Sequence, residues 1–295
     1  MRLRGFGIFA CAILLSAVAF AQTQDFYSGY LDVYIAKVKP EKRAEFDAIN
    51  KRMADANRKN KGDTWIASEV MYGEGNVVYF TSPRQSFGDI EKGIDAFMGA
   101  INKAAGGSAA GAKMMQEENN CMVSSRGEMR RRRGDLSVNP PADAAALAKM
   151  VGETRWVRTT TVRIRPGHLG EYEQQLKAIK AAREGEMSKM TALVSQSAGG
   201  QQGAAFYITT LAKSMADFDA TPTPLPKLLG QEGFDKYLKV TSESVLGAET
   251  IISRYLPELS NPPEQIAAVA PDFWKPKPAV TMKAKHKAEE ASKTQ

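Results

Sequence analysis

Apolar and polar side chains alternate along residues 30–38, where Leu31, Val33 and Ile35 fall on one face. This alternation is typical of a β-strand with one side turned to a core. Pro40 follows at a position that the first turn of a helix tolerates. Apolar residues then recur at helical spacing, which predicts an amphipathic helix after the strand.

Two further strands are predicted at about residues 64–72 and 76–82, and the glycine-containing stretch between them predicts a hairpin. A second helix is indicated around residues 90–101, followed by a Gly/Ala-rich stretch and another helical segment. A last strand is expected near residues 126–133. The order is therefore strand, helix, strand, strand, helix, strand.

The same order of residue types occurs again in the second half of the chain. Tyr30 corresponds to Trp156, Tyr79 to Tyr207 and Ser86 to Ser214. Three aligned pairs of segments in one order indicate an internal duplication. The pairs are residues 30–40 with 156–166, 76–90 with 204–218, and 135–141 with 258–263.

This tandem βαββαβ layout resembles the dimeric α/β-barrel group of ferredoxin-like folds, which includes antibiotic-biosynthesis monooxygenases and NIPSNAP-like proteins. The resemblance implies an α+β fold in which two tandem ferredoxin-like units pack as an intramolecular, pseudo-dimeric α/β barrel. The group includes cofactor-free oxygenases, haem enzymes and proteins without known activity, so the fold does not choose a function. The expected domains are a signal peptide at 1–21, a first unit at 28–141, a linker at 142–153, a second unit at 154–263 and a disordered basic tail at 264–295.

The first residues have the composition of a cleavable signal peptide. Arg2 and Arg4 precede an apolar run, and Ala19-Phe20-Ala21 fits a small-x-small cleavage site. The expected product begins near Gln22 and is periplasmic or secreted. Without residues 1–21 the formal net charge falls from +7 to +5 and one cysteine is left, so no internal disulfide can form.

Motifs for a cofactor or a metal are missing from the sequence. There is no HExxH, CxxC or histidine cluster, no phosphate-binding GxxxxGK[ST], no GxGxxG after a strand and no GxSxG elbow. His168 falls between a strand and a helix at the position of Lys42 in the first unit, as a surface turn residue would. Cys121 has no histidine near it in sequence, so it is expected to be inert. We therefore expect no bound cofactor and no metal, and no residue is assigned a catalytic role.

Candidate ligand-binding residues come from the strands. If Leu31, Val33 and Ile35 pack on helices, then Asp32 and Tyr34 point into the barrel, and Arg158 does so from the second unit. A polar lining with aromatic walls suits a small-molecule pocket. The alternatives are a position at the barrel rim, or an ion pair that only orients the two units.

A run of arginines near the end of the first unit has the alternation of a strand. Arg130 and Arg132 share one face and Arg131 and Arg133 the other, so one pair is expected to point inward. Buried arginines require an anion, either Glu69, Glu128 or an acidic ligand. The alternatives are a solvated strand end and a polyanion-binding patch. The run lacks interleaved aromatic residues, which argues against nucleic acid.

Residues after Pro263 are rich in lysine and proline and lack apolar periodicity, which predicts the disordered tail. Phe273 and Trp274 could dock it on the domain, and its lysines could make a weak contact with an anionic envelope surface.

The predicted function is binding of a small acidic or aromatic molecule between the two units. The alternatives are a cofactor-independent oxygenase acting on such a ligand, and a structural or partner-binding envelope protein with a filled barrel. The sequence does not indicate an oligomeric state.

Overall fold

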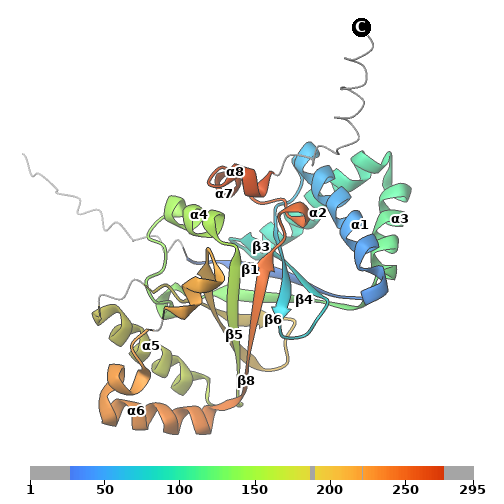
Figure 1. Cartoon of the computed structure of the whole chain (residues 1–295). Coiled ribbons are helices and arrows are strands. Elements are labelled where there is room, and N and C mark those ends of the chain that lie inside the picture. Colours follow the sequence, from blue (N-terminus) through green and yellow to red (C-terminus); the bar gives the residue numbers. More distant parts are fainter. Residues whose placement is uncertain (1–26, 187–189, 221, 276–295) are drawn as a thin grey trace, which may run out of the picture.

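The chain folds around one closed barrel of eight strands, seen in a computed structural model that describes residues 27–186, 190–220 and 222–275 (Figure 1). The strand order around the barrel is β1-β3-β2-β8-β5-β7-β6-β4, and every neighbouring pair is antiparallel.

The first unit supplies β1 (Tyr30–Val38), α1 (Arg43–Asn60), β2 (Ile66–Tyr72), β3 (Val77–Arg84), α2 (Phe87–Ala105), α3 (Ser108–Asn120) and β4 (Met122–Arg132). The second supplies β5 (Trp156–Ile164), α5 (Leu169–Gly185), β6 (Leu193–Gly199), β7 (Ala204–Ala212), α6 (Leu225–Ser244) and β8 (Val245–Tyr255).

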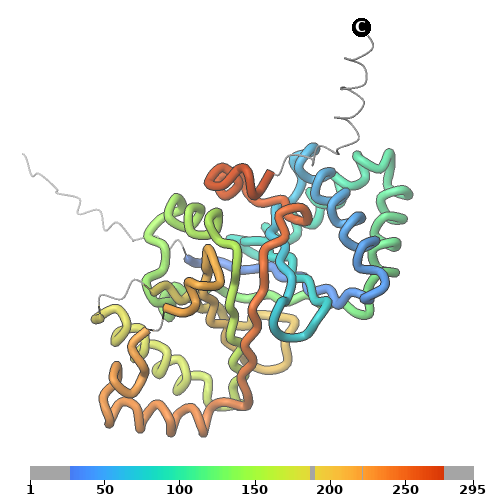
Figure 2. The backbone as a smooth tube through the Cα atoms, viewed as in Figure 1, coloured from blue at the N-terminus to red at the C-terminus, as the bar shows by residue number. Residues whose placement is uncertain are grey.

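Each unit contributes four consecutive strands of the barrel. The order is β4-β1-β3-β2 in the first unit and β8-β5-β7-β6 in the second, so the two halves repeat one topology. They join where β2 pairs with β8 and where β4 pairs with β6. The prediction of a tandem, pseudo-dimeric α/β barrel is therefore confirmed. The long strands β5 and β8 lie side by side in Figure 2, within the second half.

Helices of each unit cover the outside of its own half of the barrel, at opposite sides of Figure 1. In the first half, Phe46 and Met53 of α1 pack with Ile101 of α2 against Val78. In the second half, Tyr172 and Leu176 of α5 pack against strand residues that include Val162 and Phe206. Burying these apolar faces supplies the main driving force for packing the helices on the sheet.

The duplication extends to the start of the helix that follows the hairpin. Ser86 and Asp89 form a capping box at the start of α2, and Ser214 and Asp217 form the same box in the second unit. Each satisfies backbone N–H groups that have no partner inside the helix. The second box opens only a short 3-10 helix, Met215–Asp219, where the first unit has the long helix α2.

The segments between and after the units form a cap over one end of the barrel. The predicted linker contains α4 (Ala144–Glu153), and the predicted tail begins with α7 (Glu264–Ala267) and α8 (Pro271–Trp274). These three helices lie together in Figure 1 and are called the cap below. The prediction of disorder from residue 264 is therefore wrong for residues 264–275. Residues 1–26 and 276–295, with the signal peptide and the rest of the tail, lie outside the described residues.

Trp274 holds the cap together and, with it, covers the barrel end. Its side chain is fully buried, its indole N–H donates to the carbonyl of Gly152 at 2.9 Å, and its ring lies 5.6 Å from that of Tyr255. A Cβ on Gly152 would stand 2.6 Å from the Cβ of Val269, so glycine permits the close approach of α4 to the segment that follows α7.

Among the described residues, no helix is both long and apolar enough to cross a membrane.

We expect Trp274→Ala to lower the free energy of unfolding by about 3–5 kcal/mol, because it empties a fully buried site. Tyr72→Ala is the matched control, since Tyr72 is 61% exposed on a strand, and it should cost under about 1 kcal/mol. Urea unfolding of both variants measures the difference. An equal loss in free energy of unfolding for Trp274→Ala and Tyr72→Ala would contradict the role assigned to Trp274.

Candidate binding site inside the barrel

Side chains of β4 bring most of the charge into the barrel. Arg130 lies opposite Leu31 of β1 and Glu128 lies opposite Val33, so these four residues share one face of the sheet. That face is the interior, because Leu31 and Arg130 line one cavity to which all eight strands and the cap contribute residues. Every second residue from Arg126 to Arg132 therefore points into the barrel.

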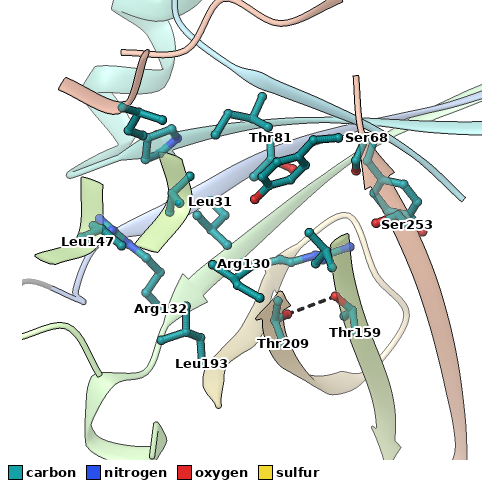
Figure 3. A pocket seen from close by; sticks show the side chains of 18 of the residues that line it. Leu31, Ser68, Thr81, Arg130, Arg132, Leu147, Thr159, Leu193, Thr209 and Ser253 are labelled. Carbon is teal, nitrogen blue, oxygen red and sulfur yellow. Dashed lines mark hydrogen bonds between the residues drawn. The ribbon is translucent and has the colours of Figure 1, made fainter. Parts of the chain in front are cut away.

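The first cavity, here called the apolar chamber, lies between the cap and the middle of the barrel and has a volume of about 190 Å³. Figure 3 shows Arg130 and Arg132 extending from β4 among its aliphatic and threonine side chains. Arg130 and Arg132 are its only charged lining residues, among those the structure describes. Its apolar walls are Leu31, Ile66, Pro83, Leu147, Val151, Val157, Leu193, Leu211, Ile251, Pro263 and Ile266, and its other polar walls are Tyr27, Ser68, Tyr79, Thr81, Thr159, Thr161, Thr209, Ser253 and Tyr255.

Glu128 occupies the middle of the barrel, and its side chain is only 1% exposed. Nε and Nη2 of Arg130 both donate to Oε2 of Glu128, at 3.0 and 2.6 Å. Nε of Arg126 and the amide of Gln201 donate to Oε1, at 3.0 and 2.8 Å. The hydroxyl of Tyr207 donates to Oε2 at 3.1 Å, so the buried carboxylate has five hydrogen bonds from both units. These residues are called the central cluster below.

Electrostatics keep the central cluster ionised. Burial raises the pKa of Glu128, but the charge of Arg130 and the hydrogen bonds from Arg130 and Arg126 outweigh burial and lower the pKa below its ordinary value of 4.5. Burial also raises the pKa of the Tyr207 phenol to about 12, although the charge of Arg130 opposes it. The guanidinium of Arg130 stacks on the Tyr207 ring, 3.7 Å from its centroid. At neutral pH the cluster therefore holds a carboxylate, two guanidinium groups and a neutral phenol.

A second cavity, here called the polar chamber, lies on the other side of the central cluster and has a volume of about 360 Å³. Tyr79, Arg130, Thr161 and Ile251 line both chambers, so they form the partition between them. The remaining lining residues are mainly polar or charged. They are Ile35, Lys37, Val70, Glu74, Val77, Ser124, Ser125, Arg126, Glu128, Arg163, Gln201, Tyr207 and Glu249.

Asp32 and Tyr34 do not point into the barrel, and the strand face expected from the sequence is wrong for β1. Asp32 lies 3.3 Å from Nη2 of Arg84, which also pairs with Asp63 at 2.6 Å. Tyr34 packs against the helix-side core, and its ring lies 6.1 Å from that of Phe80. In a closed barrel both faces of a strand are covered, so an apolar face can turn inward while a paired aspartate faces the helices.

Arg158 and Glu69 also lie outside both chambers. Arg158 stands over the ring of Phe218, 4.9 Å from its centroid. Glu69 pairs with Arg43 of α1 at 2.8 Å and with Arg254 at 2.9 Å. The expected inward position of Arg158 is therefore wrong, and Glu69 is not the anion for the inward arginines. That anion is Glu128 for Arg130.

Arg130 and Arg132 do lie at the apolar chamber, and their role in binding a ligand stays a prediction. Arg131 hydrogen-bonds to Gln196 at 3.5 Å, and Arg133 pairs with Asp135 and Glu173. The alternation of charge in residues 126–132 is the sequence signal for the cluster. Tyr207 and Gln201 carry no such signal, because tertiary structure alone brings the second unit to Glu128.

Haem, which occurs in the group that the layout resembles, would find none of its commonest iron ligands in the described lining of these cavities. The apolar chamber is smaller than the roughly 300–1,000 Å³ of pockets for drug-sized ligands. No described histidine, cysteine or methionine lines either chamber, so tyrosine is the only described lining residue of a kind that binds haem iron. His168 lies at the turn before α5 and contacts Glu171 at 2.7 Å. Cys121 is buried in the core under α1. No cluster of metal-binding residues occurs in the part of the chain that the structure describes.

Comparisons with known proteins give matches only among solved structures, since no family model and no curated protein matches the chain. An anthrone oxidase-like protein matches with a TM-score of 0.46 and 12% identity over 78% of this chain and 92% of its own. Chlorite dismutase from Candidatus Nitrospira defluvii matches at 0.44 and 10% over 82% and 96%. A heme-binding protein from Thermus thermophilus matches at 0.43 and 10% over 79% and 93%. These values describe a likeness in chain layout and carry no argument about activity.

We expect Glu128→Gln to lower the free energy of unfolding at pH 7 by about 3 kcal/mol, because it leaves two arginines beside a neutral amide. The pKa of Glu128 is lowered by folding, so its contribution is complete above about pH 4.5 and is lost as the pH falls through the lower, folded value. The stability difference between wild type and variant should therefore shrink in acid. Denaturant unfolding at a series of pH values measures it.

Glu258→Gln is the control for this experiment. Glu258 pairs with Lys51 at 3.0 Å, but the side chains are 57% and 52% exposed. An exposed pair contributes under about 1 kcal/mol, so this variant should show a small difference. A Glu128→Gln cost as small as that of the control would contradict the central cluster as a stabilising unit.

Proposed function

We propose that the apolar chamber binds one ring-sized organic molecule that carries an anionic group. The observation that carries this proposal is a cavity of about 190 Å³ inside the barrel with largely apolar walls, whose charged side chains, among the described residues, are two arginines. An apolar cavity of ~150 Å³ holds benzene, so a single ring with one small substituent suits this volume. The two arginines favour a carboxylate over a neutral or cationic substituent.

The walls also define how such a molecule would lie. Aliphatic side chains of the cap, Leu147 and Ile266, form one end of the chamber, so the ring belongs there. Arg130 also lines the polar chamber, so it borders the side of the apolar chamber away from the cap. Its Nη1 makes no hydrogen bond to another described residue, so the carboxylate belongs beside β4. Thr159 and Thr209, which are joined by a 3.1 Å hydrogen bond, offer hydroxyl groups to further polar substituents.

An oxygen-dependent reaction on the same molecule, without a bound cofactor, is the second candidate function. The observation that favours it is the apolar lining that the cap supplies through Leu147, Val151 and Ile266, since such chemistry requires that water be kept from a reactive intermediate. Consumption of dissolved oxygen upon addition of a bound acid would support this candidate.

The third alternative, a barrel filled by side chains, requires a close-packed interior, which differs from the two chambers described above.

We expect benzoate to raise the melting temperature of the protein, because a ligand that binds only the folded state stabilises it. Benzyl alcohol, which has the same ring and no charge, should bind more weakly by about tenfold in Kd, since it lacks the charge-assisted hydrogen bonds. Arg132→Gln should reduce this preference for the acid. Ligand-observed NMR titration gives the two dissociation constants.

Val157→Phe tests whether binding occurs in the chamber, because the larger side chain fills part of its volume. Val123→Phe is the matched control, since Val123 is 62% exposed and lies at neither chamber. Benzoate binding that is lost in the first variant and kept in the second supports the proposal. Binding that both variants keep, or its absence in the wild type, overturns it.

We also propose that the protein acts outside the cytoplasm. The support is the positive, apolar and small-residue order of residues 1–21, which lie outside the described residues. We expect the protein recovered from its own cells to begin at Gln22, and intact-mass measurement with N-terminal sequencing tests this. Recovery from the cytoplasm with residues 1–21 still attached would contradict export.

A further inference from the structure

The polar chamber has no part in the function proposed above, yet it is the larger of the two cavities. It continues into a hollow between residues 200–203, in the turn before β7, and residues 246–249 of β8. Arg126, Arg163 and Glu249 line both the chamber and this hollow. A small solute therefore enters the polar chamber from the end of the barrel opposite the cap.

Charge in the polar chamber is not balanced. Its lining includes four cationic side chains and three carboxylates. Lys37 and Glu74 neutralise each other across 2.7 Å. Glu128 is shared by Arg126 and Arg130, so one positive charge at this position has no carboxylate of its own.

Arg126 holds Glu128 with only one of its three nitrogens. Nε donates to the carboxylate at 3.0 Å, and neither terminal nitrogen makes a hydrogen bond to another described residue. The side chain is 56% exposed, so its terminal nitrogens face the chamber mouth and water. Two parallel N–H groups of a guanidinium match the two oxygens of a carboxylate or phosphate.

Arg163 presents a second guanidinium from the opposite unit. Within the described residues it makes no side-chain hydrogen bond and no ion pair. It is on the same face of β5 as Thr161, whose partner across the sheet is Glu249 of β8. Glu249 stands diagonally from Arg163 without pairing with it, so it limits how much negative charge the mouth of the chamber accepts.

We propose that the polar chamber is a second binding site, for a small oxyanion, with its oxygens held by the guanidinium groups of Arg126 and Arg163. The hydroxyl groups of Ser124 and Thr161 in the same lining are further donors. The volume of about 360 Å³ leaves room for a short organic chain or for water around the anion. The site is distinct from the apolar chamber, because neither arginine lines that chamber.

The test uses inorganic phosphate and succinate as separate probes in calorimetric titrations of the purified protein. We expect at least one probe to bind with a Kd of about 1 mM or tighter. Arg163→Gln and Arg126→Gln should each weaken that binding at least tenfold. Arg165→Gln is the matched control, because Arg165 is exposed, lies two positions further along and lines neither chamber.

The choice of probe distinguishes a phosphate ligand from a carboxylate ligand, and binding of either supports an oxyanion site. Failure of both probes to bind the wild type overturns the proposal. So does equal weakening by Arg163→Gln and Arg165→Gln, which would indicate general attraction to a basic surface. Benzoate binding should be unchanged in Arg163→Gln, so failure of this site and failure of the apolar chamber give different results.

Discussion

The interaction on which the rest of the barrel depends is the burial of one carboxylate, Glu128, among donors from both halves of the chain. Removing a carboxylate from water costs several kcal/mol unless charge and hydrogen bonds replace the lost hydration. Arg126 and Arg130 of its own strand supply the charge, and Tyr207 and Gln201 of the second unit complete the donors. The first unit alone would leave Glu128 without two of these donors. The cluster therefore specifies how the halves join as well as how the interior is divided.

The duplication preserved the backbone and made the chemistry unequal. β4 and β8 have the same length and the same place in their units, and each is followed by a 3-10 helix. The inward positions of β4 carry arginine, glutamate, arginine and arginine, whereas those of β8 carry glutamate, isoleucine, serine and tyrosine. In a dimer of identical chains every inward charge would occur twice, and two copies of Glu128 would repel across the barrel. A fused tandem chain avoids this constraint, so one half can carry the charges and the other half the apolar and hydroxyl walls.

The layout of the fold could be predicted from the sequence because it depends on local patterns. Alternation predicted the strand at residues 30–38, and the recurrence of that pattern at 156–164 predicted the second unit. The direction of the strand faces could not be predicted in the same way. Leu31 and Val33 are as suited to the barrel interior as to a helix-covered core, because both environments are apolar. Contacts between residues distant in sequence, the pairing of Asp32 with Arg84 and the packing of Tyr34 on Phe80, show which face turns outward.

The cap was missed for a related reason. α7 and α8 are too short to show helical periodicity, and the lysines that follow them dominate the composition. Phe273 and Trp274 are the large aromatic residues of this segment, and Trp274 is fully buried against α4. Large aromatic residues in an otherwise polar segment are thus better predictors of docking than the average composition of that segment.

Arg130 gives the two chambers a physical connection. It lines both, stacks on Tyr207 and holds Glu128, which Arg126 holds from the other side. An anion bound at the proposed site beside Arg126 would compete with Glu128 for that guanidinium, and the carboxylate would then depend more strongly on Arg130. A tighter pair between Glu128 and Arg130 would leave less of the Arg130 charge for the anion proposed to bind in the apolar chamber. If both proposed sites bind anions, each anion would therefore weaken the binding of the other through the shared carboxylate, and by thermodynamic linkage the loss of affinity would be the same in both directions.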